Sequence, residues 1–425
     1  MTTHWRLAPQ SILFAVFLGA LAALPPISID MALPALADIA RSLHASASQA
    51  GLTLSLFMAG FAVGPIVYGP LSDARGRKPT LLLGLALFTV GGIVSALAPG
   101  IGVLLGARLV QGIGAGAGMT VALAVVRDLF EGNAMQHRLA AITVVANVAP
   151  IVAPSIGVGL LAAIEWRGIY GVMAVCGLLA ALVTWAGLTE SAPQRSAGVA
   201  VSGLRDGYRR VLTHRAVIGH ILINGFGFGW MFAYVAGSPL VLLHILHVRP
   251  IVYAAMFAMT GAGIVAGATV NGFIGARGFE SRGILATAIC VTLAASFGLI
   301  TLSVMHWVSL LTVMPLLVAS TFCFGLAAPS AAHGALDPIP EVAGVAGGLL
   351  TSIQMLCGAA SSSVVALLFP ALGIFAMSGV MTACALLAGM VWIWLGRREG
   401  IETPSAVADV NPASSVYKAI TRCFD

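Results

Sequence analysis

The chain has 425 residues, of which 59% are hydrophobic and only 8% are charged, and its mean hydropathy is +1.01. Ordinary soluble proteins carry roughly a quarter charged residues, so this composition excludes both a water-soluble globule and a disordered chain. The long apolar runs do not alternate as the strands of an outer-membrane barrel do, which leaves a bundle of transmembrane helices.

Twelve segments are long and apolar enough to cross the ~30 Å core of a bilayer, which takes about 20 residues. Six lie at 11–35, 49–71, 79–98, 103–127, 138–162 and 168–188, and six more at 215–243, 252–275, 283–304, 308–332, 343–369 and 373–396. The first segment stays apolar to about Leu36, which is longer than the core of a secretory signal.

The connection between the sixth and seventh segments is the longest and most polar of all. It predicts an N-terminal six-helix half at 1–190, a cytoplasmic linker at 191–213, a C-terminal half at 214–398 and a cytoplasmic tail at 399–425. Tyr208, Val211 and Leu212 recur at helical spacing beside arginines, so a short helix on the inner leaflet is expected in the linker. Residues 74–76 and 276–278 repeat the string Ala-Arg-Gly at matching places in the two halves, as internal duplication would produce.

The distribution of basic residues predicts that both termini are cytoplasmic. Three lie on the opposite side of the membrane (Arg41, Arg167 and Arg249) and one, Arg108, lies inside a segment, while the other 17 of the 21 fall on the side of the termini. This asymmetry follows the positive-inside rule, so the net charge of +6 reflects topology and implies no nucleic-acid partner.

Several other functions are excluded by the residues that such functions need. The chain has two lysines, Lys78 and Lys418, and neither follows a glycine, so no phosphate-binding loop of the ATPase type exists. The six cysteines show no C-x-x-C pair, the glycine run at 112–118 lies inside an apolar segment, and the histidines form no membrane-embedded pair. The sequence therefore predicts neither an enzyme nor a metal site, and no cofactor beyond a proton gradient.

Two charged residues of opposite sign lie well inside the apolar segments, Asp30 in the first and Arg108 in the fourth. Charge at this depth costs ~3 kcal/mol on insertion scales, so both are functional candidates. One interpretation is a structural ion pair between two helices. The other is a proton site at Asp30 tuned by Arg108, because a carboxyl can release its proton whereas a guanidinium keeps it. Burial and the neighbouring cation would act on that carboxyl in opposite directions.

The turn at 69–79 reads Gly-Pro-Leu-Ser-Asp-Ala-Arg-Gly-Arg-Lys-Pro. Its two glycines, Gly69 and Gly76, are expected to supply unusual backbone angles. The string resembles the G-x-L-[SA]-D-x-x-G-R-[RK] signature of the major facilitator superfamily. That resemblance implies two six-helix halves and a conformational latch at Gly69, Asp73, Gly76, Arg77, Lys78 and, at the end of the fourth segment, Asp128.

Three further strings narrow the resemblance to drug/proton antiporters of the bicyclomycin- and chloramphenicol-resistance (Bcr/CflA) type. Residues 30–36 are similar to their D-M-Y-L-P-A-L string, and residues 108–112 to their R-x-x-Q-G motif. Residues 147–157 resemble their antiporter motif, through Asn147, Pro150, Pro154 and Gly157, and its prolines are expected to kink the fifth segment. Ala153 and Ala32 depart from the family strings, and residues 19–29 lack the second acid of some relatives, so coupling would rest on Asp30 alone.

The resemblance implies a proton-coupled multidrug exporter of the bacterial inner membrane, acting as a monomer on small hydrophobic drugs such as chloramphenicol- or bicyclomycin-like compounds. The alternatives are a proton-coupled carrier of a sugar or amino acid on the same fold, and a membrane receptor without transport. A substrate cavity is expected between the halves. Its candidate lining residues are Phe57, Phe61, Gln111, Asn147, Asn224, Phe228, Trp230, Tyr234 and Gln354.

Overall fold

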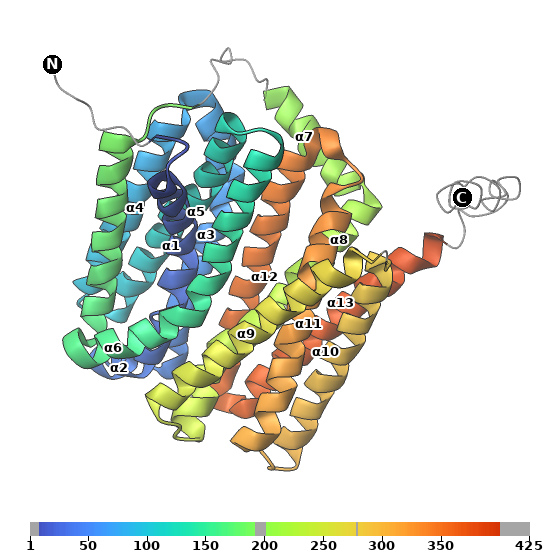
Figure 1. Ribbon diagram of the computed structural model, residues 1–425. Coiled ribbons are helices and arrows are strands. Elements are labelled where there is room, and N and C mark those ends of the chain that lie inside the picture. Colours follow the sequence, from blue (N-terminus) through green and yellow to red (C-terminus); the bar gives the residue numbers. More distant parts are fainter. Residues whose placement is uncertain (1–7, 192–200, 278, 400–425) are drawn as a thin grey trace, which may run out of the picture.

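The computed structural model describes residues 8–191, 201–277 and 279–399, and within these ranges the chain is helical with no strand (Figure 1). The first group of helices comprises α1 (Ile12–Asp30), the short η1 (Leu33–Ala35) and α2 (Leu36–Ser42), α3 (Ala47–Arg75), α4 (Arg77–Ala96), α5 (Ile101–Leu129) and α6 (Gly132–Gly187). The second comprises α7 (Val201–Thr213), α8 (Arg215–Pro239), the π-helix η2 (Leu240–Ile245), α9 (Pro250–Gly275), α10 (Ser281–Val304), α11 (Leu310–Leu336), η3 (Pro340–Val342), α12 (Ala343–Leu372) and α13 (Ile374–Glu399).

Eleven helices of the described chain are long and apolar enough to cross a membrane. One of them, α6, has 56 residues and leaves helical dihedral angles at Ile164 and Glu165, where the chain turns back at the bottom of Figure 1. Its two arms correspond to the predicted segments 138–162 and 168–188, so the expectation of twelve crossings is confirmed. Pro150 and Pro154 lie within the first of these arms, in backbone that keeps helical dihedral angles, and the kink expected at them stays a prediction.

The predicted linker helix is present as α7, but protein covers part of its apolar side. Val211 is fully buried in a cluster with Val217 and Ile221 of α8 and Ala346 and Leu350 of α12. Arg209 and Arg210 remain exposed. Helix α7 therefore rests on the second half of the molecule. Linker residues 192–200 and tail residues 400–425 lie outside the described residues.

Glycines let the helices of the first half approach through their backbones. A Cβ atom on Gly112 of α5 would lie 2.0 Å from the carbonyl oxygen of Phe57 in α3, and one on Gly116 would lie 2.6 Å from the Cα of Gly64. Real Cβ atoms do not approach so closely, so larger residues would force α3 and α5 apart. The glycine run at 112–118 thus serves helix packing, as small residues do in membrane bundles.

The two halves meet along two pairs of helices. Helix α3 packs against α12, with Gly51 against Ala366 near one end and Pro65 against Gly348 near the other. Helix α6 crosses α9, where Ile151 lies against Gly261. In Figure 1 these last two helices come close in the lower part of the view and diverge toward the top.

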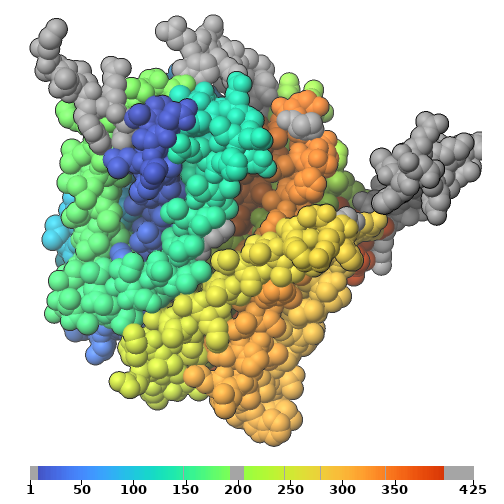
Figure 2. Space-filling model, in the orientation of Figure 1, coloured from blue at the N-terminus to red at the C-terminus, as the bar shows by residue number. Residues whose placement is uncertain are grey.

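The ends of the bundle, called here the α7 end (top of Figure 1) and the α2 end (bottom), differ in how the halves meet. At the α2 end, Leu33 and Leu36 face Leu240 and Leu243 of η2 across a small apolar cleft. We call this contact the apolar seal. Toward the α7 end, Figure 2 shows a recess between α6 and α9 with α12 behind it. The halves are therefore joined at the α2 end. Toward the α7 end they diverge between α6 and α9 but stay in contact where Pro65 of α3 meets Gly348 of α12.

Candidate functional site

Arg108 lies in the interior of the first half, and its side chain is almost fully buried. Its Nη1 donates a 2.6 Å hydrogen bond to Oε1 of Gln111, one turn along α5, and its Nη2 donates a 2.9 Å bond to the carbonyl oxygen of Ser28 in α1. The R-x-x-Q-G spacing thus has a physical meaning, because residues three apart on a helix share a face. Gln111 holds the guanidinium in the orientation that reaches α1.

No carboxylate neutralises Arg108 within the described ranges of the chain. Instead, its guanidinium carbon lies 4.3 Å from the ring centre of Phe57 and 5.3 Å from that of Tyr170, at cation–π distance. Ser28 lies in the last turn of α1, where backbone carbonyls lack helical partners and the helix dipole is negative. Arg108 therefore caps the carboxyl end of α1. The Nε of Arg108 has no hydrogen-bond partner among the described residues.

Asp30 is the last residue of α1, and it is the one acidic residue of the described chain that is buried, with 4% of its surface exposed. Its carboxyl forms no hydrogen bond or ion pair with another described residue, so the structural ion pair with Arg108 is absent from this conformation. A charged carboxylate is costly to bury without a partner. The site is therefore suited to a carboxyl that gains and loses a proton.

A group of buried hydroxyl side chains lies in α8 and α9 of the second half. The Tyr234 hydroxyl lies 2.9 Å from Oγ1 of Thr260, and the Tyr253 hydroxyl lies 3.4 Å from Oγ of Ser238. Tyr234 was a predicted cavity residue, whereas the other three were not found from the sequence, because each is a single polar residue in an apolar helix. The second half thus holds a polar cluster that joins α8 and α9.

The antiporter motif reaches the region of Asp30 through Gly157. A Cβ atom on Gly157 would lie 2.2 Å from the carbonyl oxygen of Met31, the residue after Asp30. Pro150 and Pro154 precede Gly157 in the same arm of α6. Asn147 precedes them, and its side chain lies outside the described part of the structure. The glycine of the motif therefore allows α6 to touch the backbone beside the acid.

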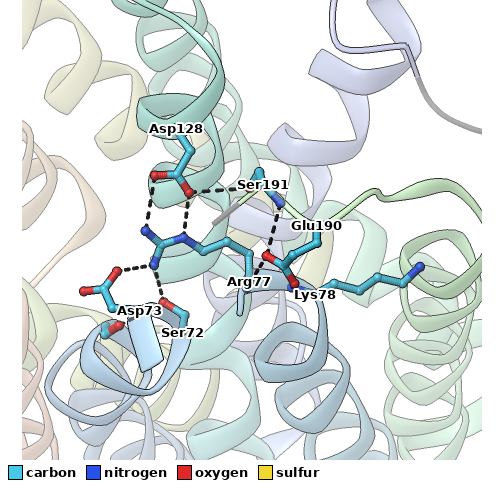
Figure 3. Close-up of polar contacts among 8 residues, drawn as sticks. Ser72, Asp73, Arg77, Lys78, Asp128, Glu190 and Ser191 are labelled. Carbon is cyan, nitrogen blue, oxygen red and sulfur yellow. Dashed lines mark hydrogen bonds and ion pairs between the residues drawn. The ribbon is translucent and has the colours of Figure 1, made fainter. Parts of the chain in front are cut away.

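The predicted latch residues meet at the α7 end (Figure 3). Arg77, at the start of α4, binds both carboxylate oxygens of Asp128, at 2.7 Å from Nε and 3.2 Å from Nη2. Its Nη1 lies 2.5 Å from Asp73 and 2.6 Å from the hydroxyl of Ser72, both in the last turn of α3. Two-point binding of a carboxylate by arginine is among the strongest polar contacts in proteins. These residues tie the ends of α3, α4 and α5 together.

Two of the latch expectations need correction or extension. Gly76 has a φ of +99°, as expected for a turn glycine, but Gly69 lies inside α3 without a positive φ and supplies no unusual angle. Glu190, which the sequence did not single out, accepts hydrogen bonds from the backbone N–H groups of Arg77 (2.7 Å) and Lys78 (3.1 Å). A lone acid after the sixth segment carries no signal of its own, so this contact becomes visible only in three dimensions.

Three predicted cavity residues lie together on the second half. Nδ2 of Asn224 in α8 donates a 3.3 Å bond to Oε1 of Gln354 in α12, and Phe228 lies one turn along α8. The ring of Phe228 is 6.1 Å from that of Phe324 in α11, which the sequence did not identify. Amide and aromatic groups at the junction of three helices can bind a small apolar molecule that carries a polar group.

Other predicted cavity residues lie elsewhere. Trp230 is turned into the second half, where its indole N–H donates a 2.9 Å bond to Ser296 of α10. Phe57 and Gln111 serve Arg108, and Phe61 is buried where α3 packs on α5. In this conformation the candidate cavity residues thus form separate clusters on the two halves.

Comparison with known proteins places this arrangement in a family. The model of the major facilitator superfamily matches residues 12–362. The chain belongs to this superfamily. It is accordingly a multi-pass membrane transporter and not an enzyme.

The curated relatives cover most of the chain. It is 33% identical to the uncharacterized MFS-type transporter YdgK of Bacillus subtilis, over 85% of this chain and 90% of that protein. It is 28% identical to the bicyclomycin resistance protein homolog of Haemophilus influenzae (84% and 89%) and 29% identical to the multidrug resistance protein MdtL of Escherichia coli O157:H7 (88% and 93%). All three relatives are bacterial.

Solved structures share the fold at low identity. A bacterial homolog of the human lysosomal transporter Spinster, in an inward-facing and unoccupied conformation, superposes with a TM-score of 0.72 at 14% identity, over 93% of this chain and 98% of that one. A D-xylose–proton symporter superposes with a TM-score of 0.67 at 14% identity, over 89% and 97%. Both likenesses concern the fold alone.

Proposed function

We propose that this transporter is a drug/proton antiporter that exports hydrophobic drugs from the bacterial cytoplasm across the inner membrane. The observation that carries the proposal is Asp30, the one buried acid of the described chain, without an ion partner at the end of α1. The similarity to the bicyclomycin resistance homolog and to MdtL supports drugs as the cargo. Both termini and the α7 end face the cytoplasm in this proposal, following the distribution of basic residues.

With this orientation the structure corresponds to an inward-facing state. The apolar seal closes the periplasmic side, and the recess of Figure 2 opens to the cytoplasm. Asp30 takes its proton from the periplasm in the outward-facing state and releases it inside after the halves have rocked. Each ligand drives the cycle only by binding the two states with different affinity, so drug and proton must favour opposite states.

Arg108 contributes by fixing the end of α1, on which Asp30 lies. It is held by Gln111 and by the carbonyl oxygen of Ser28, two residues before the acid. A guanidinium keeps its charge whether or not Asp30 is protonated, so Arg108 disfavours positively charged cargo in the interior. This favours neutral hydrophobic drugs such as chloramphenicol- or bicyclomycin-like compounds.

The latch at Arg77, Asp73 and Asp128 is proposed to stabilise the outward-facing state. All three residues belong to the first half and are already bound to each other in the inward-facing form. They therefore act as a preformed unit against which the second half closes. Asp73, half exposed, retains a face for that contact.

The test uses inside-out vesicles with an imposed proton gradient, acidic inside. Chloramphenicol-type, bicyclomycin-type and cationic dye compounds are added in turn, and proton release is recorded. Wild type is expected to release protons with neutral drugs, whereas Asp30→Asn is not. Asp38→Asn is a matched control, since Asp38 is a partly exposed acid paired only with Arg41 on α2, and such pairs contribute little.

Two results would overturn the proposal. Proton release by Asp30→Asn at the wild-type rate would show that Asp30 is not the proton-binding group. The protein would instead be a metabolite carrier if wild type released no protons with any drug but released protons when a sugar or an amino acid was added.

A further inference from the structure

We propose that Glu190 is a positioning residue of the transport cycle, which holds the latch in its working geometry and ties the start of the inter-half connection to it. Glu190 acts in addition to the contacts among Asp73, Arg77 and Asp128 described above. The role rests on the alternating-access cycle proposed above, since it concerns the probability that the α7 end closes.

The carboxylate of Glu190 occupies the amino terminus of α4. Its Oε1 accepts from the N–H of Arg77 at 2.7 Å and its Oε2 from the N–H of Lys78 at 3.1 Å. The first N–H groups of a helix lack internal partners, and a negative charge there is favourable. The residue at the cap position of α4 is Gly76, which has no side chain. Glu190, 113 positions after Arg77 in the sequence, therefore supplies the cap.

The glycine of the family signature makes room for this carboxylate. A Cβ atom on Gly76 would lie 2.6 Å from Oε2 of Glu190, closer than real Cβ atoms approach an oxygen. The φ of +99° at Gly76 is a second reason for glycine. Gly76 and Glu190 thus act as a pair: the turn that directs Arg77 toward Asp73 and Asp128 is shaped around the Glu190 carboxylate.

Further contacts connect the end of α6 to the same unit (Figure 3). The hydroxyl of Ser191 lies 3.5 Å from Oδ2 of Asp128, which also binds Arg77. Nζ of Lys78 donates a 2.8 Å bond to the carbonyl oxygen of Trp185. The ammonium group of Lys78 therefore binds the end of α6.

The consequence is mechanical. The connection between the halves leaves the first half at Glu190 and Ser191, and α7 at its far end rests on α8 and α12 of the second half. A latch that shifts when the α7 end closes must shift the anchoring point of this connection as well. Loss of the Glu190 carboxylate would leave the first N–H groups of α4 without this cap, loosen the turn that presents Arg77 to Asp73 and Asp128, and make closure less probable.

The experiment compares Glu190→Gln, Glu190→Asp and Glu190→Ala with Glu131→Gln. Glu131 is a matched control, because it is also an exposed acid at a helix start, yet its side chain makes no capping bond. Spin labels at Gln136 of α6 and at Ala276, the residue after α9, are both at exposed positions and report the separation of the halves in purified protein without drug or gradient. The six native cysteines are replaced beforehand.

The expected result is that Glu190→Gln lowers the population of short distances and the turnover number about tenfold, as loss of a charged hydrogen-bonded cap allows, with KM unchanged. Glu190→Asp should recover part of both, and Glu131→Gln should match wild type. Melting temperature checks folding.

The proposal is overturned if Glu190→Gln lowers the melting temperature but keeps the wild-type distances and turnover number, since Glu190 would then be a structural cap only. Equal behaviour of Glu190→Gln and Glu131→Gln also overturns it. A shift of distances in a protein that transports no drug would leave the role of Glu190 standing and reject the drug/proton function instead.

Discussion

The carbonyl oxygen of Met31 occupies the space where a side chain on Gly157 would begin, 2.2 Å from the Cβ position. Helix α6 therefore touches the chain immediately after Asp30 through backbone alone. The antiporter motif and the buried acid, 127 positions apart in the sequence, are parts of one contact.

Gly157→Ala should separate α6 from this backbone and disturb the surroundings of Asp30. Because backbone cannot yield as a side chain can, we expect drug-dependent proton release to fall about tenfold or more, while the protein still inserts and folds. Gly159→Ala is the matched control, since a Cβ there meets no atom within 4 Å. Equal activity of the two variants would contradict a role for this contact.

Arg108→Lys should lose most transport although the charge is kept. A lysine presents one ammonium and cannot reach Gln111 and Ser28 together in the geometry of the guanidinium fork. Loss of one charged hydrogen bond is worth about 1.5–3 kcal/mol, so we expect a fall in turnover of at least about tenfold. Drug uptake into inside-out vesicles measures it.

Arg138→Lys serves as the comparison for Arg108→Lys. Arg138 also donates to backbone carbonyls next to α1, those of Gln10 and Ser11, but at the partly exposed start of the helix. Its replacement should leave turnover within about twofold of wild type. Full activity of Arg108→Lys would show that only the charge matters.

Asp128→Asn should impair the cycle more than Asp73→Asn. Asp128 is nearly buried, with 12% of its side chain exposed, and binds Arg77 at two points, whereas Asp73 is 51% exposed and binds at one. We expect about tenfold slower turnover for Asp128→Asn and a few-fold effect for Asp73→Asn. Equal rates for Asp73→Asn and wild type would remove Asp73 from the latch.

Export of a neutral drug should depend on the membrane potential. Since Asp30, the proposed proton site, is the one buried acid of the described chain, we expect each cycle to carry one proton inward. With neutral cargo one net charge crosses, and a potential of 100 mV contributes about 2.3 kcal/mol. Collapsing the potential with valinomycin and potassium should slow neutral-drug export at constant pH gradient and leave export of a monovalent cation unchanged. Insensitivity of neutral-drug export would mean that another ion compensates the charge.

Phe228→Ala and Trp230→Phe should have different consequences despite their closeness in α8. Phe228 lies beside Asn224 and Phe324, so its loss should raise the KM for some drugs more than for others. Trp230 is bound to Ser296 inside the second half, so Trp230→Phe should lower the melting temperature without altering the order of drug preference. A changed drug order in Trp230→Phe would place the indole in contact with cargo.

The helices were predictable from sequence because a bilayer imposes a length and a polarity on every crossing. The predicted segment 252–275, for instance, is α9 at Pro250–Gly275. The turn at Ile164 and Glu165 likewise falls where it was predicted, between the segments 138–162 and 168–188.

The site was predictable where a residue is rare for its surroundings. Asp30 and Arg108 stand out as charges in apolar helices, and Arg77 belongs to a recognisable string. Glu190 and Tyr253 could not be found, because a charge after a span and a tyrosine near a helix start are ordinary features. Their importance depends on which distant backbone or hydroxyl group they meet. Trp230 was misplaced for a related reason, since depth in the membrane does not determine which way a helix face points.

The apolar seal has a consequence for energy conservation. Leu33 and Leu36 follow Asp30 by less than two helical turns and meet Leu240 and Leu243 without a polar group between them. Apolar constrictions exclude water, and protons cross only where water or polar groups relay them. In the inward-facing form proposed above, this seal would therefore block the direct passage of protons from the periplasm to Asp30. A cell that makes the transporter would then lose no proton gradient through a molecule resting in that form.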